Sequence, residues 1–498
     1  MIFPGRRGVG LEMRTIDLTT IELAECVSAE TGFELSRAIV VGGVSSGRDD
    51  WIGASYMKNP MRTFRGVQLA DLPQLEKFTE QDRHEMRVVA NLLPFKVNNY
   101  VLDELIDWSS APDDPIFRMT FPVREMVPPR IYDLVSDALL NGVDRKQLEA
   151  IARKGRQDLN PHPSGQREYN VPLLDDEPVP GLQHKYRQTL LVFPSQGQTC
   201  HSYCAYCFRW AQFVGDADLK FAAPGPGQMT DYLRGHREVT DVLLTGGDPL
   251  IMSTPVLARW VTPLLAPDLE HVTNIRLGTK ALVQWPYRVT SGPDADELLR
   301  LIEACATAGK SVAIMLHVSH PRELESEAAA AAVARLRSAG AIVRAQAPII
   351  RHVNDSPHAW ATMWRHMVRL GIQPYYTFVE RDTGASAFFE VPLAHALTIF
   401  QQAQRAVSGL ARTARGPVMS ATPGKIAIDG ETVVNGERLF VLRLLQARDE
   451  ALAGTLFFAG HSESAVWIDQ LTPALSPSWP WESSRDRTRP EPIEGVSR

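Results

Sequence analysis

Short hydrophobic runs alternate with amphipathic stretches through the middle of the chain. Six runs read as strands, and they occupy residues 187–195, 241–247, 274–280, 311–318, 341–350 and 373–379. After the second to sixth runs, hydrophobic residues recur every three or four positions, as in a half-buried helix. The helix after the fourth run is predicted from Arg322 to Ala339, with Glu323 in its first turn, which suits the helix dipole. Near-continuous hydrophobic strands are typical of a parallel sheet covered on both faces. This alternation predicts an α/β fold, built as a partial (β/α)6 TIM-like barrel.

The flanking segments have different patterns. Residues 80–159 predict an N-terminal helical region, and the Pro- and Gly-containing stretch 160–172 reads as a linker. Residues 425–445 predict a small C-terminal β-meander with turns at Asp429-Gly430 and Asn435-Gly436. The predicted parts are an extension of unknown fold (1–80), the helical region and linker (81–180), the barrel (181–410), a C-terminal segment with the β-meander (411–472) and a disordered tail (473–498).

Composition narrows the class of protein. The 498 residues carry a net charge of −6, which argues against a nucleic-acid protein that depends on phosphate contacts. The N-terminal residues contain no apolar core of a secretory signal, and no apolar run approaches the ~20 residues needed to span a bilayer. We therefore expect a cytoplasmic protein without a membrane partner, in which cysteines are more often metal ligands or redox groups than disulfides.

Three of the five cysteines lie within eight residues, in the segment CHSYCAYCFR. Thiolates hold iron–sulfur clusters, and Cys200, Cys204 and Cys207 could hold three corners of a four-iron cluster, leaving one iron open to a ligand. Three alternatives remain at this point. His201 could complete a zinc site, Cys204 and Cys207 could form a redox pair, or the three cysteines could be buried structural residues.

Polar residues follow the predicted strands where each strand ends. The second strand ends in TGGDPL, in which Gly246 and Gly247 would let the backbone approach a ligand and Asp248 could accept from an ammonium group. His317 and His320 end the fourth strand, where either a cavity or a core position is compatible with them. Because chemistry collects at the carboxyl ends of the strands in such barrels, these residues are predicted to share one site.

At this point the chain resembles a known family. The C-x3-C-x2-C spacing with Tyr206 before the last cysteine is similar to the radical S-adenosylmethionine (SAM) signature, and TGGDPL resembles that superfamily's glycine-rich SAM motif. The motifs CHSYCAYCFR, TGGDPL, RLGTK, HVSHPREL, RHVND, PYY and PGK occur in the order seen in the lysine 2,3-aminomutase family. The resemblance covers residues 92–428.

The resemblance implies a radical SAM enzyme. Cys200, Cys204 and Cys207 would bind a [4Fe-4S] cluster that cleaves SAM reductively to a 5′-deoxyadenosyl radical, and an amino group would then migrate on an amino-acid substrate. Gly246, Gly247 and Asp248 would line the SAM site. Gln346 and Arg351, which bracket the fifth strand, would also contact SAM.

Family members also use pyridoxal phosphate (PLP), bound as a Schiff base to a lysine after a glycine-rich run. Lys425 in TPGK occupies that place, although the run is shortened to one glycine. The phosphate is normally held by an Arg-Tyr-x-x-Arg segment, and the matching residues are Lys185, Tyr186, Arg187, Gln188 and Thr189, so the second arginine is missing. Lys185 could pair with the phosphate, and Arg187 could replace the lost arginine.

Two further positions bear on the substrate. The resemblance gives Arg209 the role of gripping the substrate carboxylate, for which a guanidinium is well suited. The two aspartates that bind the distal ammonium of lysine fall near Arg381 and Ser420 here. Because an arginine does not attract an ammonium group, we expect an acidic or neutral amino-acid-like substrate instead of lysine.

The predicted function is therefore a radical SAM aminomutase, an isomerase. The alternatives are a PLP-independent radical SAM enzyme (an epimerase, a lyase or another rearrangement) and a non-catalytic cluster-binding protein. The resemblance also implies an electron donor such as flavodoxin or ferredoxin and favours a homo-oligomer.

Overall fold

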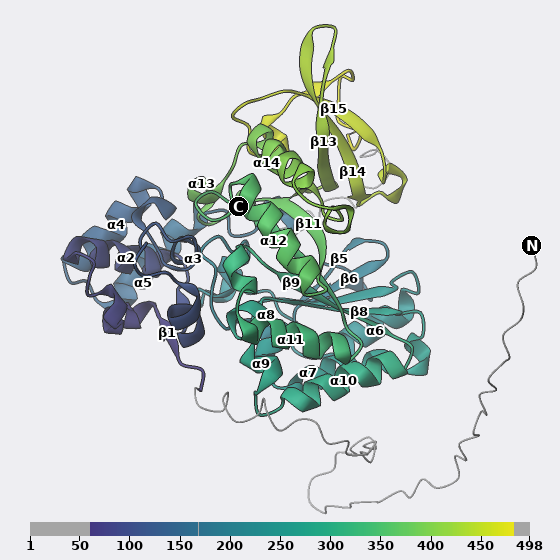
Figure 1. Cartoon of the computed structure of the whole chain (residues 1–498), viewed down its shortest axis with the longest axis horizontal. Helices are drawn as coiled ribbons and strands as arrows, with labels where there is room; N and C mark the ends of the chain where they lie inside the picture. The colour runs from purple at the N-terminus through teal and green to yellow at the C-terminus, as the bar shows by residue number, and fades with distance from the viewer. Residues whose placement is uncertain (1–59, 168, 483–498) are drawn as a thin grey trace, which may run out of the picture. The chain divides into compact units, whose positions relative to one another are not determined.

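The computed structural model describes residues 60–167 and 169–482 (Figure 1). The expectations for residues 1–59 and 483–498 lie outside the described residues. A mixed sheet dominates the described part, with twelve strands in the spatial order β16 to β5, which runs consecutively along the chain. Helices follow its parallel strands, so the predicted α/β fold is confirmed.

Each parallel strand pairs with the next one along the chain. The strands are β6 (Thr189–Val192), β7 (Asp241–Leu244), β8 (Asn274–Thr279), β9 (Ser311–His317), β10 (Ile342–Ile349), β11 (Gln373–Val379) and β12 (Arg415–Ser420). The longer helices between them are α6 (Gly227–Gly235), α7 (Thr254–Val261), α10 (Ala295–Thr307), α11 (Glu327–Ser338), α12 (Pro357–Arg369) and α14 (Leu393–Arg405). Short helices α8 (Ala281–Gln284), α9 (Tyr287–Thr290) and α13 (Ser386–Phe389) complete these connections. The sequence analysis did not predict β12.

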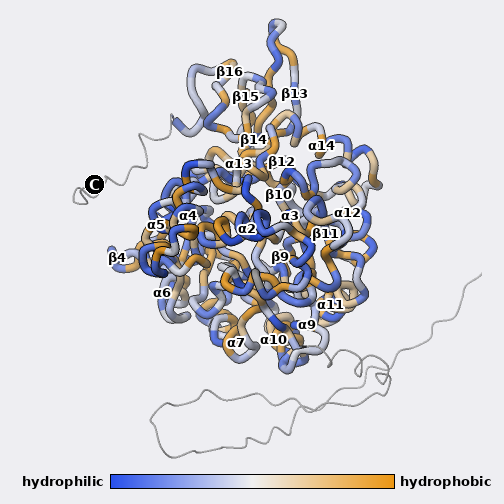
Figure 2. The backbone as a smooth tube through the Cα atoms, turned by 90° about the vertical axis from the view of Figure 1, so that its left-hand side faces the viewer, coloured by the Kyte–Doolittle hydropathy of each residue, from blue (hydrophilic) through white to orange (hydrophobic). Residues whose placement is uncertain are grey.

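The two faces of the parallel strands differ. On β7, Val242 and Leu244 are fully buried in the core beneath the helices, whereas Asp241 and Leu243 line a cavity. Connections between neighbouring parallel strands share one hand, so consecutive strand order puts the helices on the same side of the sheet. The helices therefore cover one face of these strands, and the cavity lies against the other face. Hydrophobic and hydrophilic segments alternate along the covering helices in Figure 2, and the buried positions of α10 recur every three or four residues.

Helix α11 begins later than predicted. It starts at Glu327, after Ser326, whose hydroxyl accepts from the Ala329 N–H at 3.0 Å as an N-terminal cap. The preceding residues, Pro321–Leu324, form a separate 3-10 turn. Glu323 is consequently a fully buried residue of this turn and takes no part in a helix dipole.

Antiparallel strands flank the parallel ones. They are β5 (Leu182–Tyr186) at one edge, and β13 (Gly424–Val434), β14 (Glu437–Ala447), β15 (Leu456–Gly460) and β16 (Pro473–Ala474) at the other. Asn435 and Gly436 have φ of 52° and 85° and form the tight turn between β13 and β14, as predicted. Asp429-Gly430 forms no turn, because it lies within β13 at a register shift in the pairing with β14.

The segment predicted as a disordered tail is partly folded. Strand β16 pairs with β15, and the rings of Trp479 and Trp481 stack with centroids 5.3 Å apart. Both rings meet Phe457 edge-on, at 5.8 and 5.5 Å. Residues 473–482 therefore belong to the fold, since their aromatic side chains cover the outer strands.

The helical region precedes the sheet in the chain. It contains α2 (Glu80–Leu92), α3 (Pro115–Thr120), α4 (Pro129–Leu140) and α5 (Arg145–Gln157), with the antiparallel pair β1 (Thr63–Arg65) and β2 (Lys96–Asn98); a second small pair, β3 (Leu173–Leu174) and β4 (Glu177–Pro178), follows. Thr79 and Asp82 cap α2 reciprocally, which fixes its start. Among the residues described, no helix has the length and apolar composition required to cross a bilayer.

Candidate active site

A cavity of about 390 Å³ lies against the face of the parallel strands that the helices do not cover. Its walls hold most of the residues that the sequence singled out, among them Lys185, Tyr186, Cys200, Cys204, Cys207, Arg209, Gly246, Gly247, Asp248, Gln346 and Lys425. Arg351 does not line it, and its backbone N–H donates to the Phe389 carbonyl at 2.8 Å in the turn after β10. The prediction that Arg351 contacts SAM has no support in this geometry, because its side chain does not line the cavity.

The cysteine loop (residues 200–209) is fastened by the helical region. The N–H groups of Tyr203 and Ala205 donate to the carbonyls of Lys96 and Met119, at 2.8 and 2.7 Å. The Lys96 ammonium in turn donates to the Cys200 carbonyl at 2.6 Å. A loop without regular structure is thus held in one conformation by residues that lie more than 80 positions earlier in the chain.

The three thiols are half-buried at the cavity wall. Burial raises the pKa of all three, that of Cys207 to about 12, so the thiolate forms call for a cationic partner. Across residues 60–167 and 169–482, no group of three or more His, Cys, Asp or Glu side chains converges on one metal ion. His201 does not line the cavity, so the zinc alternative finds no fourth ligand there. Three separated thiols around a shared space suit a cluster better than a single ion.

The two glycines allow close packing between the loop after β7 and the cysteine loop. A Cβ atom on Gly247 would lie 2.3 Å from the Thr199 carbonyl oxygen, and one on Gly246 would lie 2.2 Å from the Gln198 side chain. The Asp248 N–H donates to that same Thr199 carbonyl at 2.8 Å. The glycines are therefore needed for contact between two protein loops, in addition to the ligand approach predicted from the sequence.

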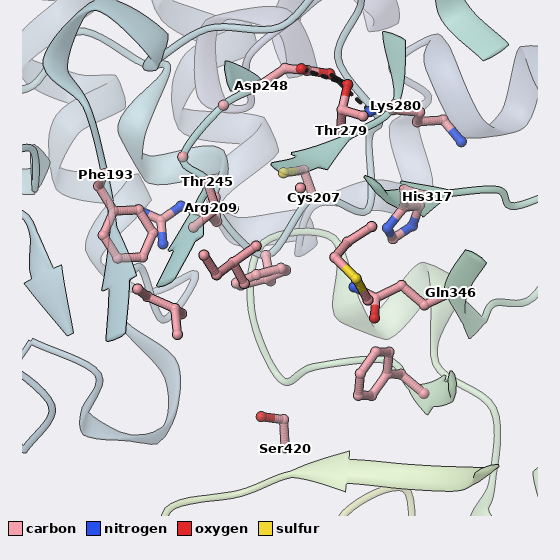
Figure 3. Close-up of a pocket in the computed structure, with 18 of the residues that line it drawn as sticks. Phe193, Cys207, Arg209, Thr245, Asp248, Thr279, Lys280, His317, Gln346 and Ser420 are labelled. Atoms are coloured by element: carbon pink, nitrogen blue, oxygen red, sulfur yellow. Dashed lines mark hydrogen bonds between the residues drawn. The ribbon is translucent and has the colours of Figure 1, made fainter. Parts of the chain in front are cut away.

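Donors of the chain itself hold Asp248 in place (Figure 3). Its carboxylate accepts from the Thr279 hydroxyl at 2.7 Å, from the Lys280 N–H at 2.8 Å and from the Leu250 N–H at 2.9 Å. These three donors engage both oxygens, which together offer about four acceptor sites. Asp248 therefore joins the loop after β7 to the end of β8, and its contact with the SAM ammonium stays a prediction.

Sequence reasoning missed a buried polar network beneath the cysteine loop. Lys280 forms an ion pair with Glu323 at 2.6 Å and donates to the Ser319 hydroxyl at 3.1 Å. The Tyr206 hydroxyl bonds the same Ser319 hydroxyl at 2.5 Å and His317 Nε2 at 2.9 Å. The quoted motifs RLGTK and HVSHPREL contain four of these five residues, but only their spatial meeting reveals the network.

The two histidines after β9 separate into different roles. His317 lines the cavity, and burial lowers its pKa to about 3, so its imidazole is neutral at ordinary pH. His320 accepts from the Arg322 N–H through Nδ1 at 3.3 Å and caps the following turn. His320 is thus structural, whereas His317 is available to a ligand.

Arg209 is a buried cation at the cavity wall. Its side chain is only 7% exposed and its guanidinium lies over the Phe193 ring, 3.9 Å from the centroid (Figure 3). Its Nε atom is buried without an acceptor, and the described chain supplies no carboxylate partner. Burial lowers the pKa of the group to about 10, yet it stays charged at neutral pH. Such a group is poised to bind an anion.

Lys425 presents an amine of unusual acidity. The pKa of this amine is lowered to about 7, first by burial and then by the charges of Arg276 and Arg415. The amine donates to the Gln446 side chain and lies 4.8 Å from the ring centroid of Tyr186. A buried lysine that is about half neutral at pH 7 can act as a nucleophile.

Two basic side chains of the segment that matches the phosphate-binding motif point in different directions at the end of β5. Lys185 points inward, where its ammonium donates to the Ala421 carbonyl, and burial lowers its pKa. Arg187 points outward, is 59% exposed and pairs with Glu450 at 2.7 Å. The prediction that Arg187 could replace the missing arginine is therefore wrong.

The two positions expected to decide the substrate lie together. The Arg381 guanidinium donates to the Ser420 carbonyl at 3.1 Å and lies over the Phe208 ring, 4.8 Å from its centroid. Both Arg381 and Ser420 line the cavity. The neighbouring Asp382 is exposed and does not line it.

Curated proteins of known name resemble this chain. A protein of Aquifex aeolicus (strain VF5), named "Putative L-lysine 2,3-aminomutase", is 32% identical over 405 residues, which span 81% of this chain and 94% of that protein. The L-lysine 2,3-aminomutase of Clostridium subterminale is 29% identical over 47% of this chain and 53% of its own length. The glutamate 2,3-aminomutase of Clostridioides difficile (strain 630) is 26% identical over 47% of this chain and 52% of its own length.

Other comparisons are less informative. No family model matches the chain. Among solved structures, a radical SAM methyltransferase from Sphaerobacter thermophilus overlaps 57% of this chain and 93% of its own, with a TM-score of 0.34 and 16% identity.

The likeness to the Aquifex protein extends over nearly all of that protein, and it confirms the family predicted from the cysteine and glycine motifs. The chain belongs to the lysine 2,3-aminomutase family of radical SAM enzymes.

Proposed function

We propose that this chain is a radical SAM aminomutase whose substrate is an amino acid other than lysine. One observation carries the proposal: three thiols, a buried guanidinium and a lysine amine with a lowered pKa all face the same cavity. The thiols suit an iron–sulfur cluster, the guanidinium suits a substrate carboxylate, and the amine suits a cofactor with a carbonyl group. The names of the lysine and glutamate 2,3-aminomutases among the relatives support this combination.

The cysteine loop is proposed to hold the cluster and SAM. Cys200, Cys204 and Cys207 would ligate a [4Fe-4S] cluster, since they supply three sulfur donors at one wall. Gly246 and Gly247 would border SAM, and Gln346 offers an amide from the opposite strand β10. When bound, the cluster and SAM would together supply a 5′-deoxyadenosyl radical. PLP would supply electron delocalisation while the amino group migrates.

The opposite wall fits PLP. Lys425 would hold the cofactor through its amine, which is neutral enough at pH 7 to react. Lys185 would face the phosphate, and the Tyr186 ring, which lies between both lysines at 5.5 and 4.8 Å, would bound the ring of the cofactor. Arg209 would hold the substrate carboxylate between the two cofactors, in a space from which water is largely excluded.

We also propose that β6 to β11 and their helices form a partial (β/α)6 barrel. The consecutive order of parallel strands, with helices on one face and the cavity on the other, supports this architecture. An electron donor such as flavodoxin or ferredoxin would supply the reducing electron in the cell.

Anaerobic reconstitution tests the function. The holoprotein, incubated with SAM, dithionite and a panel of α-amino acids, is expected to form 5′-deoxyadenosine and a β-amino acid. Cys204→Ala is expected to abolish both the cluster absorbance and SAM cleavage. Cys305→Ala is the matched control, since Cys305 is buried in α10 away from the cavity. Full cluster absorbance in Cys204→Ala would refute the proposal.

A PLP-independent radical SAM enzyme is the second candidate. The outward position of Arg187 favours it, because Lys185 is then the one cation of the matching segment that faces the cavity. Reconstitution with PLP separates the two candidates. The aminomutase proposal requires a visible absorbance band of bound PLP that disappears in Lys425→Ala, whereas the second candidate requires SAM cleavage at the same rate without PLP.

A further inference from the structure

Two arginines at the cavity have no carboxylate partner in the part of the chain that the structure describes. Arg209 lies against Phe193, and Arg381 lies against Phe208, at 3.9 and 4.8 Å from the ring centroids. Aromatic faces and one backbone carbonyl hold the two guanidiniums in place, but none of these contacts neutralises a charge. Both groups therefore keep donors free for a ligand.

Two other cations that line the cavity do have carboxylate partners. Arg276 pairs with Asp241 at 2.6 Å, and Lys280 pairs with Glu323 at the same distance. The cavity's remaining carboxylate, Asp248, is occupied by hydroxyl and backbone donors, as described above. Glu380 and Asp382 flank Arg381 in the chain and act on its charge, but no carboxylate among the described residues forms an ion pair with Arg209 or Arg381.

The two arginines meet at the cysteine loop. Phe208, on which Arg381 rests, is the residue directly before Arg209 and directly after the ligand candidate Cys207. Both guanidiniums therefore face the same end of the cavity, beside the proposed cluster, and bringing two like charges together out of water is costly without an anion.

We infer that Arg209 and Arg381 together select an α-amino dicarboxylic acid, with Arg209 on the α-carboxylate and Arg381 on the distal carboxylate. The inference rests on the proposed function for the identity of the reacting site. Two carboxylates satisfy two guanidiniums, each by paired hydrogen bonds. A lysine substrate would bring its ammonium next to Arg381, and this repulsion excludes it.

Arg381 also lies near the proposed cofactor wall. Its charge lowers the pKa of Lys185, so the phosphate of PLP is the other anion within its reach. Arg381 donates to the Ser420 carbonyl and Lys185 donates to the next carbonyl, that of Ala421, so both cations lie near the same turn. The position of Arg381 over Phe208, in the cysteine loop, favours the substrate. The experiment must therefore measure cofactor content and substrate selectivity separately.

Equilibrium dialysis of radiolabelled amino acids against the reconstituted holoprotein with SAM provides a readout without turnover. L-glutamate and L-aspartate are compared with L-glutamine, L-asparagine and L-lysine. We expect one of the dicarboxylates to bind about 10- to 100-fold more tightly than its amide, which is the worth of hydrogen bonds to a charged group. Arg381→Gln should remove this preference, and Arg381→Lys should retain part of it.

Arg443→Gln is the matched control, because Arg443 pairs with Asp429 on an exposed part of β14 and should leave the preference unchanged. Equal binding of acid and amide by the wild-type protein, or an undiminished preference in Arg381→Gln, would overturn the inference. Loss of PLP absorbance in Arg381→Gln with the preference intact would also overturn it and assign Arg381 to the phosphate.

SAM cleavage, measured as 5′-deoxyadenosine, reports on the proposed function independently. Cleavage with lysine or a neutral amino acid, without dicarboxylate binding, would leave the proposed function standing and remove the inference. An Arg381-dependent acid preference without any SAM cleavage would support the dicarboxylate site while the proposed function fails.

Discussion

The low pKa of Lys425 leads to a prediction about chemical reactivity. Burial and the neighbouring charges of Arg276 and Arg415 lower the pKa of this amine from 10.5 to about 7. Amines react with carbonyl reagents in the neutral form, so the reactivity of Lys425 should rise as the pH passes about 7 and should level off above pH 8.

The size of the effect follows from the two pKa values. At pH 8 an amine of pKa about 7 is roughly 90% neutral, whereas an ordinary lysine amine is about 0.3% neutral. The fraction of reactive Lys425 at this pH should therefore exceed that of a free lysine side chain by about 300-fold. Since both fractions approach one at high pH, the advantage should shrink to less than about twofold near pH 11.

Reductive labelling measures this profile. The protein and Nα-acetyl-lysine are incubated together with PLP and a mild hydride reductant between pH 6 and pH 11, and the labelled peptide containing Lys425 is quantified by mass spectrometry. A labelling midpoint within one pH unit of 7 is expected. A midpoint that coincides with that of acetyl-lysine would refute the reasoning, because it would mean that water reaches the amine freely.

Two further predictions concern the loops that meet at the cysteines. Gly247→Ala is expected to lower the iron bound per chain severalfold, because the added Cβ would collide with the Thr199 carbonyl. Gly227→Ala is the control and should bind iron as the wild type does, because its added Cβ would meet no atom within 4 Å. Lys280→Met is expected to destabilise the fold by about 3–5 kcal/mol, since it strands the fully buried Glu323 carboxylate, and the double variant Lys280→Met/Glu323→Gln should recover most of the loss in melting temperature. Unchanged iron content in the first case, or an unchanged melting temperature in the second, would contradict these expectations.

The parallel strands were predictable from the sequence because their hydrophobic runs are short and bounded by polar residues. The carboxyl ends of parallel strands lie together, which placed Cys200 and Asp248 at one site. Lys425 lies in the antiparallel strand β13 and was assigned through the family resemblance. Strand β12 was missed, since RGPVMS contains a glycine and a proline and lacks a hydrophobic run. The Asp429-Gly430 turn was predicted wrongly because the same dipeptide also suits a bulge in a long strand.

The roles of individual charges were harder to predict. Glu323 was assigned to a helix dipole, yet it is a buried partner of Lys280, which lies 43 residues earlier in the chain. Asp248 was assigned to a ligand only, yet it also accepts from Thr279 and Lys280 of the chain itself. Such pairings depend on contacts between distant segments, which the local pattern of one sequence does not contain. Arg187 was misjudged for a simpler reason, because it lies in the turn after β5, where its side chain reaches the surface and pairs with Glu450.

The attachment of the cysteine loop to Lys96 and Met119 has a consequence for how the protein is made. Synthesis proceeds from the N-terminus, so both carbonyls leave the ribosome about 80 to 110 residues before the cysteines that depend on them. The residues that hold the loop are thus already synthesised when the cysteines emerge. Exchanging the helical region for that of another protein would remove this early support, so the region belongs to cofactor assembly as much as to the fold.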